Sequence, residues 1–196
     1  MKNSDTFITI KSPAEGYYTE KRSKFYAFIH PVSSAEEVKE LNAHYRKKYY
    51  DARHACYAYR LGPDGSLFRA NDDGEPSSTA GKPILGVLLS ANVTDAVIFV
   101  IRYYGGVNLG TGGLIVAYRA AAADALSHAE QTEKIVERQL THSFTYPEMN
   151  AVMKIVKDMQ LRVVSQDFGS TTCSITLAVR LSDYDLLQTR LQDIRF

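Results

Sequence analysis

The sequence predicts an α+β protein made of two small domains. Three observations support this class. The chain has 196 residues, whereas single domains most often have about 100–150. Aromatic and β-branched segments are interleaved with helical periodicities throughout. A second compact pattern of elements begins after residue 134. We therefore expect an N-terminal domain of β-α-β type over residues 1–134 and a C-terminal domain over residues 135–196.

The first half of the N-terminal domain is predicted as a strand, a helix and a hairpin. An aromatic, β-branched run that ends before Pro31 predicts the strand. The capping box of Ser34 and Glu37 opens the helix, which carries apolar residues at helical spacing. A turn cluster, GPDG, joins the two hairpin strands. These elements are expected at residues 24–30, 33–49, 53–61 and 66–70.

The second half of this domain contains its most apolar segment. DAVIFVIRYY, residues 95–104, is an apolar run that predicts a strand buried on both faces. A short apolar helix over residues 84–91 is expected before it, with Ser78 or Thr79 as its cap. An Ala-rich helix over residues 114–129 is expected after it.

The C-terminal pattern is strand-helix-strand-strand-helix, which is most of a ferredoxin-like unit. Alternating apolar residues predict the strands, Pro147 suits a first helical position, and Ser182 opens the last helix. A short final strand is expected to begin at residues 194–196.

Composition limits the classes of function. The net charge is +1, with 16 Lys+Arg against 15 Asp+Glu up to residue 134 and 7 against 7 beyond it. Any nucleic-acid surface must therefore be a local patch. No apolar run has the length of a membrane span and the N-terminus does not resemble a signal peptide. Cys56 and Cys173 make no disulfide framework, so a cytoplasmic location is expected, with no membrane partner.

A Gly-rich turn follows the buried strand. It contains Gly105, Gly106, Gly110, Gly112 and Gly113, and Arg102 lies just before it. Glycines allow close approach and left-handed backbone, and the first amides of the following helix attract anions. The turn therefore predicts either a phosphate cradle that uses Arg102 or a tight turn packed on the sheet. It is neither a dinucleotide fingerprint nor a Walker loop.

Two further groups of residues could carry chemistry. Asp72, Asp73 and Glu75 lie in one turn and could hold Mg²⁺, move protons or cap the next helix. His54 and Cys56 share a strand face and could form a nucleophile pair, or Cys56 could be a small core residue. We assign no catalytic residue, metal ligand or cofactor.

Four stretches resemble the IMPACT family, whose bacterial members include YigZ. They are KRSKF (21–25), HACYAY (54–59), DDGEPSSTAGKPIL (72–85) and RYYGGVNLGTGGL (102–114). The tail, from FTYP (144–147) onward, is similar to the second domain of bacterial members. Ser78 departs from the family motif, which more often has Gly there. Val116 departs too, where a basic residue is common, although Arg119 could compensate.

The resemblance implies two folds. The N-terminal domain is expected to share the fold of a ribosomal-protein domain and of small-metabolite kinases. The C-terminal domain is expected to be similar to the last, ferredoxin-like domain of elongation factor G. Eukaryotic relatives regulate translation by interfering with activation of the amino-acid-starvation kinase, using an additional N-terminal domain.

Two functions follow as hypotheses. The first is a protein that binds RNA or the ribosome, or another protein partner, and regulates translation; the oligomeric state stays open. The alternative is an enzyme that acts on a phosphorylated small molecule through the acidic turn. The candidate ligand residues are His54, Asp73, Glu75, Arg102, Gly105, Gly106, Gly110, Gly112, Gly113 and Arg119.

Overall fold

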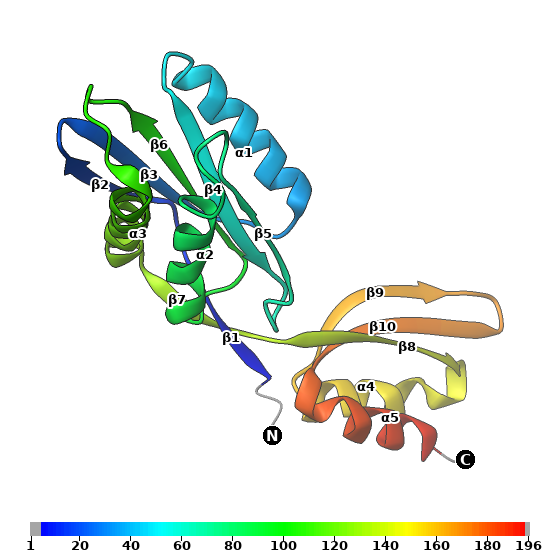
Figure 1. Ribbon diagram of the computed structural model, residues 1–196. Coiled ribbons are helices and arrows are strands. Elements are labelled where there is room, and N and C mark those ends of the chain that lie inside the picture. Colours follow the sequence, from blue (N-terminus) through cyan, green and yellow to red (C-terminus); the bar gives the residue numbers. More distant parts are fainter. Residues whose placement is uncertain (1–4, 195–196) are drawn as a thin grey trace. The chain divides into compact units, whose positions relative to one another are not determined.

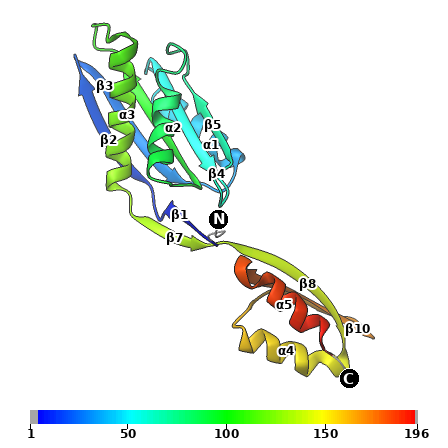
Figure 2. The same ribbon diagram turned by 60° about the horizontal axis from the view of Figure 1, so that its bottom comes forward.

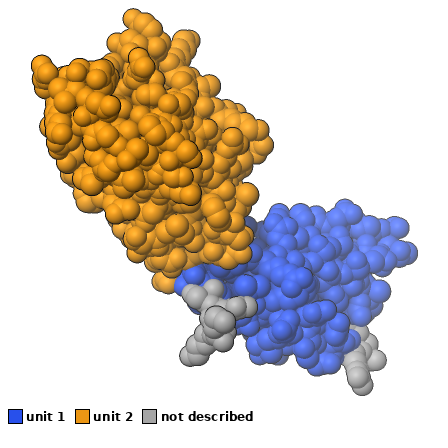
Figure 3. All heavy atoms as spheres, viewed as in Figure 1, with its two compact units in different colours: residues 1–6, 135–196 blue, residues 7–134 orange. Residues whose placement is uncertain are grey.

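The computed structural model describes residues 5–194. Residues 7–134 form one compact unit, and residues 135–194 form the other together with the two described residues that precede Phe7 (Figure 3). We describe each unit by itself. Both combine helices with antiparallel sheet, which confirms the α+β class. Among the described residues, no helix combines the length and apolar character that a membrane crossing requires.

A five-stranded antiparallel sheet is the centre of the first unit, with the order β2-β3-β6-β4-β5 (Figure 1). The β-α-β arrangement is present in a split form. β3 and β4 run parallel to each other, and β6 lies between them, antiparallel to both. The strands are β2 (Ala14–Glu20), β3 (Ser23–Pro31), β4 (His54–Leu61), β5 (Leu67–Asn71) and β6 (Ala96–Tyr103).

Helices cover both faces of this sheet (Figure 1). α1 (Ala35–Lys48) covers one face, and α2 (Gly81–Ser90) and α3 (Gly110–His128) cover the other. The central β6 is consequently buried on both sides from Ala96 to Arg102, as its apolar run predicts. The predicted cap of α1 is also confirmed, because the Ser34 side chain accepts a hydrogen bond from the Glu37 amide at 3.2 Å.

Three strands of this half of the chain are not predicted from the sequence. β1 (Thr6–Ile10) and β7 (Gln131–Ile135) run side by side as a separate two-stranded ribbon (Figure 2). The third is β2, where Gly16 lets α3 pack directly on the strand. A Cβ atom at Gly16 would lie 2.2 Å from the Ala125 nitrogen. The glycine that weakens the strand signal is thus required by helix packing.

The second unit has a three-stranded sheet in the order β8-β10-β9, with α4 and α5 on one face (Figure 1). β8 and β9 are parallel on either side of the antiparallel β10, so this unit also contains a split β-α-β. Its elements are β8 (Glu137–Thr145), α4 (Met149–Asp158), β9 (Arg162–Phe168), β10 (Thr172–Arg180) and α5 (Tyr184–Gln192). The expected final strand lies mostly outside the described residues.

Candidate functional site

Glu75 is the centre of a buried polar network. Its carboxylate accepts a hydrogen bond from Arg102 Nη1 at 2.6 Å and another from the Tyr118 hydroxyl at 2.7 Å. Burial, reinforced by the neighbouring Cys56 and Glu75, raises the pKa of Tyr118, which therefore donates as a neutral phenol. The network links the loop after β5, the end of β6 and the middle of α3. It joins both long sequence motifs into one structural element.

Arg102 is not available to an incoming anion. The residue is only 5% exposed, its guanidinium pairs with Glu75, and Phe25 and Tyr104 each place a ring centroid 5.6 Å away. Its Nε atom has no hydrogen-bond partner among the described residues. The prediction that Arg102 helps to cradle a phosphate is therefore wrong, because its guanidinium is buried and already paired through Nη1 with an internal carboxylate.

Asp72 caps α2. Its Oδ1 accepts from the amides of Ala80 and Gly81 at 3.0 and 2.8 Å, and its Oδ2 accepts from the Ser78 amide at 2.9 Å. The predicted cap by Ser78 or Thr79 is wrong, since the N-cap position of α2 is occupied by Ala80, which has no side chain that can accept a hydrogen bond. Ser78 adopts φ +66°, a conformation that favours glycine, which explains why a glycine suits this motif position.

Asp73 holds the start of β4. Its carboxylate accepts from the Ala55 amide at 2.6 Å and pairs with Arg46, while its carbonyl oxygen accepts from His54 Nδ1 at 2.7 Å. His54 Nε2 lies 3.8 Å from Glu75 Oε2. Burial lowers the pKa of His54 against the opposing effect of Glu75. The three carboxylates of the turn therefore serve three different partners instead of facing one ion.

This arrangement does not support the metal or nucleophile versions of the enzyme hypothesis. In the part of the chain that the structure describes, no three His, Cys, Asp or Glu side chains gather in a way that could hold a metal ion. Cys56 is fully buried, and its thiol donates to the Asp72 carbonyl oxygen at 3.0 Å. Burial raises the pKa of Cys56 to about 12, so the reactive thiolate is not populated near neutral pH.

The Gly-rich turn packs against the hairpin that joins β2 to β3. A Cβ atom at Gly105 would lie 2.1 Å from the Arg22 carbonyl carbon, and the Gly105 amide donates to Ser23 Oγ at 3.2 Å. Gly106 and Gly110 adopt φ +81° and +68°. α3 begins at Gly110, four residues before the predicted start. The amides of its first turn remain a predicted anion site, to which Gly112 and Gly113 belong.

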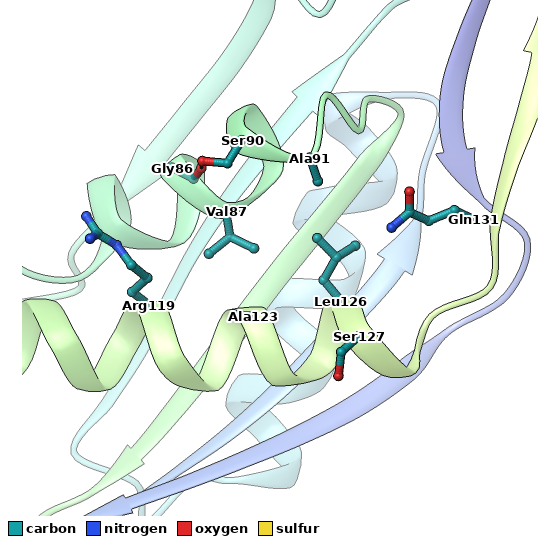
Figure 4. A pocket seen from close by; sticks show the side chains of 9 residues that line it. All are labelled: Gly86, Val87, Ser90, Ala91, Arg119, Ala123, Leu126, Ser127 and Gln131. Atoms are coloured by element: carbon teal, nitrogen blue, oxygen red, sulfur yellow. Dashed lines mark hydrogen bonds between the residues drawn. The ribbon is translucent and has the colours of Figure 1, made fainter.

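Arg119 does not belong to this turn. It lies nine residues beyond Gly110 on α3, which is roughly 13 Å along a helix. Its side chain points toward α2 and lines a different cavity, shown in Figure 4. Whether Arg119 compensates for the family's basic residue at Val116, one turn before it on α3, stays a prediction.

A pocket that sequence reasoning missed lies beside the Gly-rich turn. We call it the tyrosine pocket. It measures about 430 Å³ and is lined by Arg22, Lys24, Tyr26, Tyr49, Tyr103 and Tyr104. Its residues come from the β2-β3 hairpin, β3, the end of α1 and the end of β6. Two signals were available in the sequence, the KRSK run and the paired tyrosines immediately before Gly105.

The tyrosines of this pocket are arranged as a wall of rings. Tyr26 is stacked on Tyr49 with centroids 6.4 Å apart and meets Tyr103 edge-on at 6.1 Å. The Tyr103 hydroxyl donates to Asp51 at 2.7 Å. Burial and Asp51 raise the pKa of Tyr103 to about 12, so this ring is neutral. Tyr104 is 54% exposed and stands at the rim.

The fold and the motifs define a two-unit α+β protein in which the two long motifs meet through Glu75 and Arg102 at one end of a split β-α-β sheet. The model of the family described as the Impact N-terminal domain matches residues 21–126. The chain belongs to the IMPACT family, which confirms the resemblance of its motifs.

Relatives extend the match to most of the chain. The IMPACT family member YvyE of Bacillus subtilis is 34% identical over 155 residues, which are 79% of this chain and 71% of that protein. YigZ of Escherichia coli is 33% identical over 150 residues, which are 76% of this chain and 74% of that protein. The crystal structure of a hypothetical protein superimposes with a TM-score of 0.76 at 28% identity, covering 97% of this chain and 93% of the other.

Proposed function

We propose that this protein binds single-stranded RNA in a translational context and that the tyrosine pocket is its contact surface. The observation that carries the proposal is the pocket itself, in which two cations and four tyrosines line one cavity. Bases of any sequence stack on aromatic rings, and cations beside the rings neutralise the phosphates.

The rings are suited to stacking because they are already ordered. Tyr26 packs on both Tyr49 and Tyr103, so little side-chain freedom is left to lose on binding. Tyr104 completes the set with an exposed ring at the rim. Each stacked base contributes about 1–3 kcal/mol in proteins of this kind.

The cations supply the local positive charge that the overall charge of +1 does not reveal. Arg22 and Lys24 line the pocket and are exposed, and Lys48 lies 5.3 Å from the centroid of the Tyr49 ring. None of the three forms an ion pair among residues 5–194. With so few cations we expect weak binding with a shallow dependence on salt.

The hairpin that presents Arg22 is strained. Lys21 and Arg22 form its two-residue turn with φ +45° and +66°, a conformation that such turns usually give to Asn and Gly. Non-glycine residues in this region cost on the order of 1 kcal/mol each and are concentrated at functional sites. The strain supports a role for Arg22 outside the fold.

The family supports the translational context and a cytoplasmic location. The kinship with a ribosomal-protein domain and with the last domain of elongation factor G, which the resemblance implies, remains a prediction and favours the same class of partner. In this proposal the buried network only supports the pocket; its members are His54, Asp73, Glu75 and Arg102. Gly105 lets the hairpin that carries Arg22 pack against the end of β6.

Replacing Tyr104 tests the proposal. Tyr104→Ala should weaken binding of a fluorescently labelled twelve-nucleotide poly(U) strand about ten-fold, measured by anisotropy in 50 mM salt, because one stacked base is lost. Arg22→Gln should reduce the slope of log affinity against log salt by about 0.7, the contribution of one phosphate contact on a single strand.

Tyr50→Ala is the matched control, because Tyr50 is 85% exposed and does not line the pocket. It should leave the affinity unchanged. Thermal midpoints of all variants should match the original protein within about 2 °C. Equal losses for Tyr104→Ala and Tyr50→Ala, or no RNA binding by the unmodified protein, would count against the proposal.

A further inference from the structure

A second cavity lies in the first unit, on the side of the sheet covered by α2 and α3. It occupies about 670 Å³ between the two helices and reaches Gln131 on β7 (Figure 4). We call it the α2-α3 groove. It shares no lining residue with the tyrosine pocket. Its volume is within the range of about 300–1,000 Å³ that is typical of small-molecule sites.

The groove is open because the facing residues are small. A Cβ atom at Gly86 would meet no other heavy atom within 4 Å, and Ala123 faces it from α3. Below them Val87 and Leu126, each 8% exposed, form an apolar floor that is continuous with the core of the unit. The middle of the groove therefore suits an apolar group.

Hydrogen-bond donors face the groove mainly at its two ends. The two hydroxyls in its wall donate hydrogen bonds within their own helices. Ser90 donates to the Gly86 carbonyl and Ser127 to the Asp124 carbonyl, both at 2.7 Å. Arg119 at one end and Gln131 at the other still have donors to offer (Figure 4). Arg119 forms no ion pair or hydrogen bond within the described residues.

We propose that the α2-α3 groove binds a small amphipathic carboxylate. The carboxylate lies against the guanidinium of Arg119, whose fork of donors matches two carboxylate oxygens. The apolar body covers Val87, Ala123 and Leu126, and a polar far end can reach Gln131. Arg119 and Ser127 are eight residues apart on α3, roughly 12 Å along the helix, so the ligand is elongated.

The probes are octanoate, octanol and octylammonium, titrated into isotopically labelled full-length protein and followed by amide NMR shifts. Octanoate should shift the amides of Gly86 and its neighbours in the groove. It should bind about ten-fold or more tightly than octanol, because only octanoate makes a charge-assisted bond to Arg119. Octylammonium should bind more weakly than octanol, since like charges meet at that end.

Two variants separate the charge from the cavity. Arg119→Gln should reduce the affinity for octanoate to that for octanol. Gly86→Leu, which fills open space in a helix, should abolish binding of both probes. Ala123→Leu is the second filling variant if Gly86→Leu fails to fold. Lys82→Gln, an exposed change on α2 outside the cavity lining, is the matched charge control and should bind octanoate normally.

The proposal is overturned by any of three results. These are no shifts with octanoate, equal affinities for octanoate and octylammonium, or an octanoate affinity that Arg119→Gln leaves unchanged. A thermal midpoint that differs little among the variants excludes unfolding as the cause.

Discussion

Arg102→Ala should lower the free energy of unfolding by about 3–5 kcal/mol, because it leaves the Glu75 carboxylate buried without its cation. The measurement is urea denaturation followed by circular dichroism. Arg53→Ala removes an exposed arginine just before β4 and should change the free energy of unfolding by less than about 0.5 kcal/mol. If Arg102→Ala lowered the free energy of unfolding as little as Arg53→Ala, the Glu75–Arg102 pair would not stabilise this end of the sheet.

A double replacement separates charge from packing. Glu75→Gln alone should also destabilise, since the Arg102 guanidinium would be left without a counter-charge. Combining Glu75→Leu with Arg102→Met removes both charges, and the loss of unfolding free energy should be smaller than the sum of the losses measured for Glu75→Leu and Arg102→Met separately. Additive losses would contradict a direct interaction between the two residues.

Gly105→Ala should destabilise the protein by on the order of 3 kcal/mol, because the new Cβ atom would overlap the backbone of the hairpin at Arg22 and Ser23. Backbone cannot rotate aside as a flexible side chain can. The same urea experiment measures the effect. RNA affinity should fall as well, since the hairpin that carries Arg22 must move.

Gly112→Ala is the matched control in the same motif. A Cβ atom there meets no other heavy atom within 4 Å, and the residue lies inside α3. Alanine should stabilise the helix by about 0.5–1 kcal/mol relative to glycine. If both glycine variants behaved alike, the close packing of Gly105 against the hairpin would be wrong.

The elements with strong periodicity were predictable from the sequence. β6 is buried on both faces as its unbroken apolar run indicates, and the capping box of Ser34 and Glu37 marks the start of α1. The split β-α-β order was not predictable, because nothing local to β3 or β4 shows that β6 inserts between them. β2 is not evident in the sequence because Gly16 and Glu20 occupy two of its four partly buried positions, where an alternating strand would have apolar side chains.

The sequence indicated that the acidic turn and the Gly-rich turn lie close together, but not the geometry of their contact. The acidic turn and Arg102 do meet, through Glu75, yet they neutralise each other inside the protein. A sequence shows charges but not their burial, so an internal pair resembles an open anion site. The tyrosine pocket was missed because its members are distant in the chain, and the register that pairs Lys24 with Tyr103 becomes visible only in the folded sheet.

The most direct test of the proposed function is an NMR titration of the labelled protein with unlabelled twelve-nucleotide poly(U) RNA. The account predicts that the largest amide shifts fall on residues 21–26, Tyr49 and residues 103–106, which surround the tyrosine pocket. Tyr104→Ala should reduce these shifts at equal RNA concentration. The account would be contradicted if RNA bound but shifted only amides of the second unit, or left the amides around the tyrosine pocket unshifted.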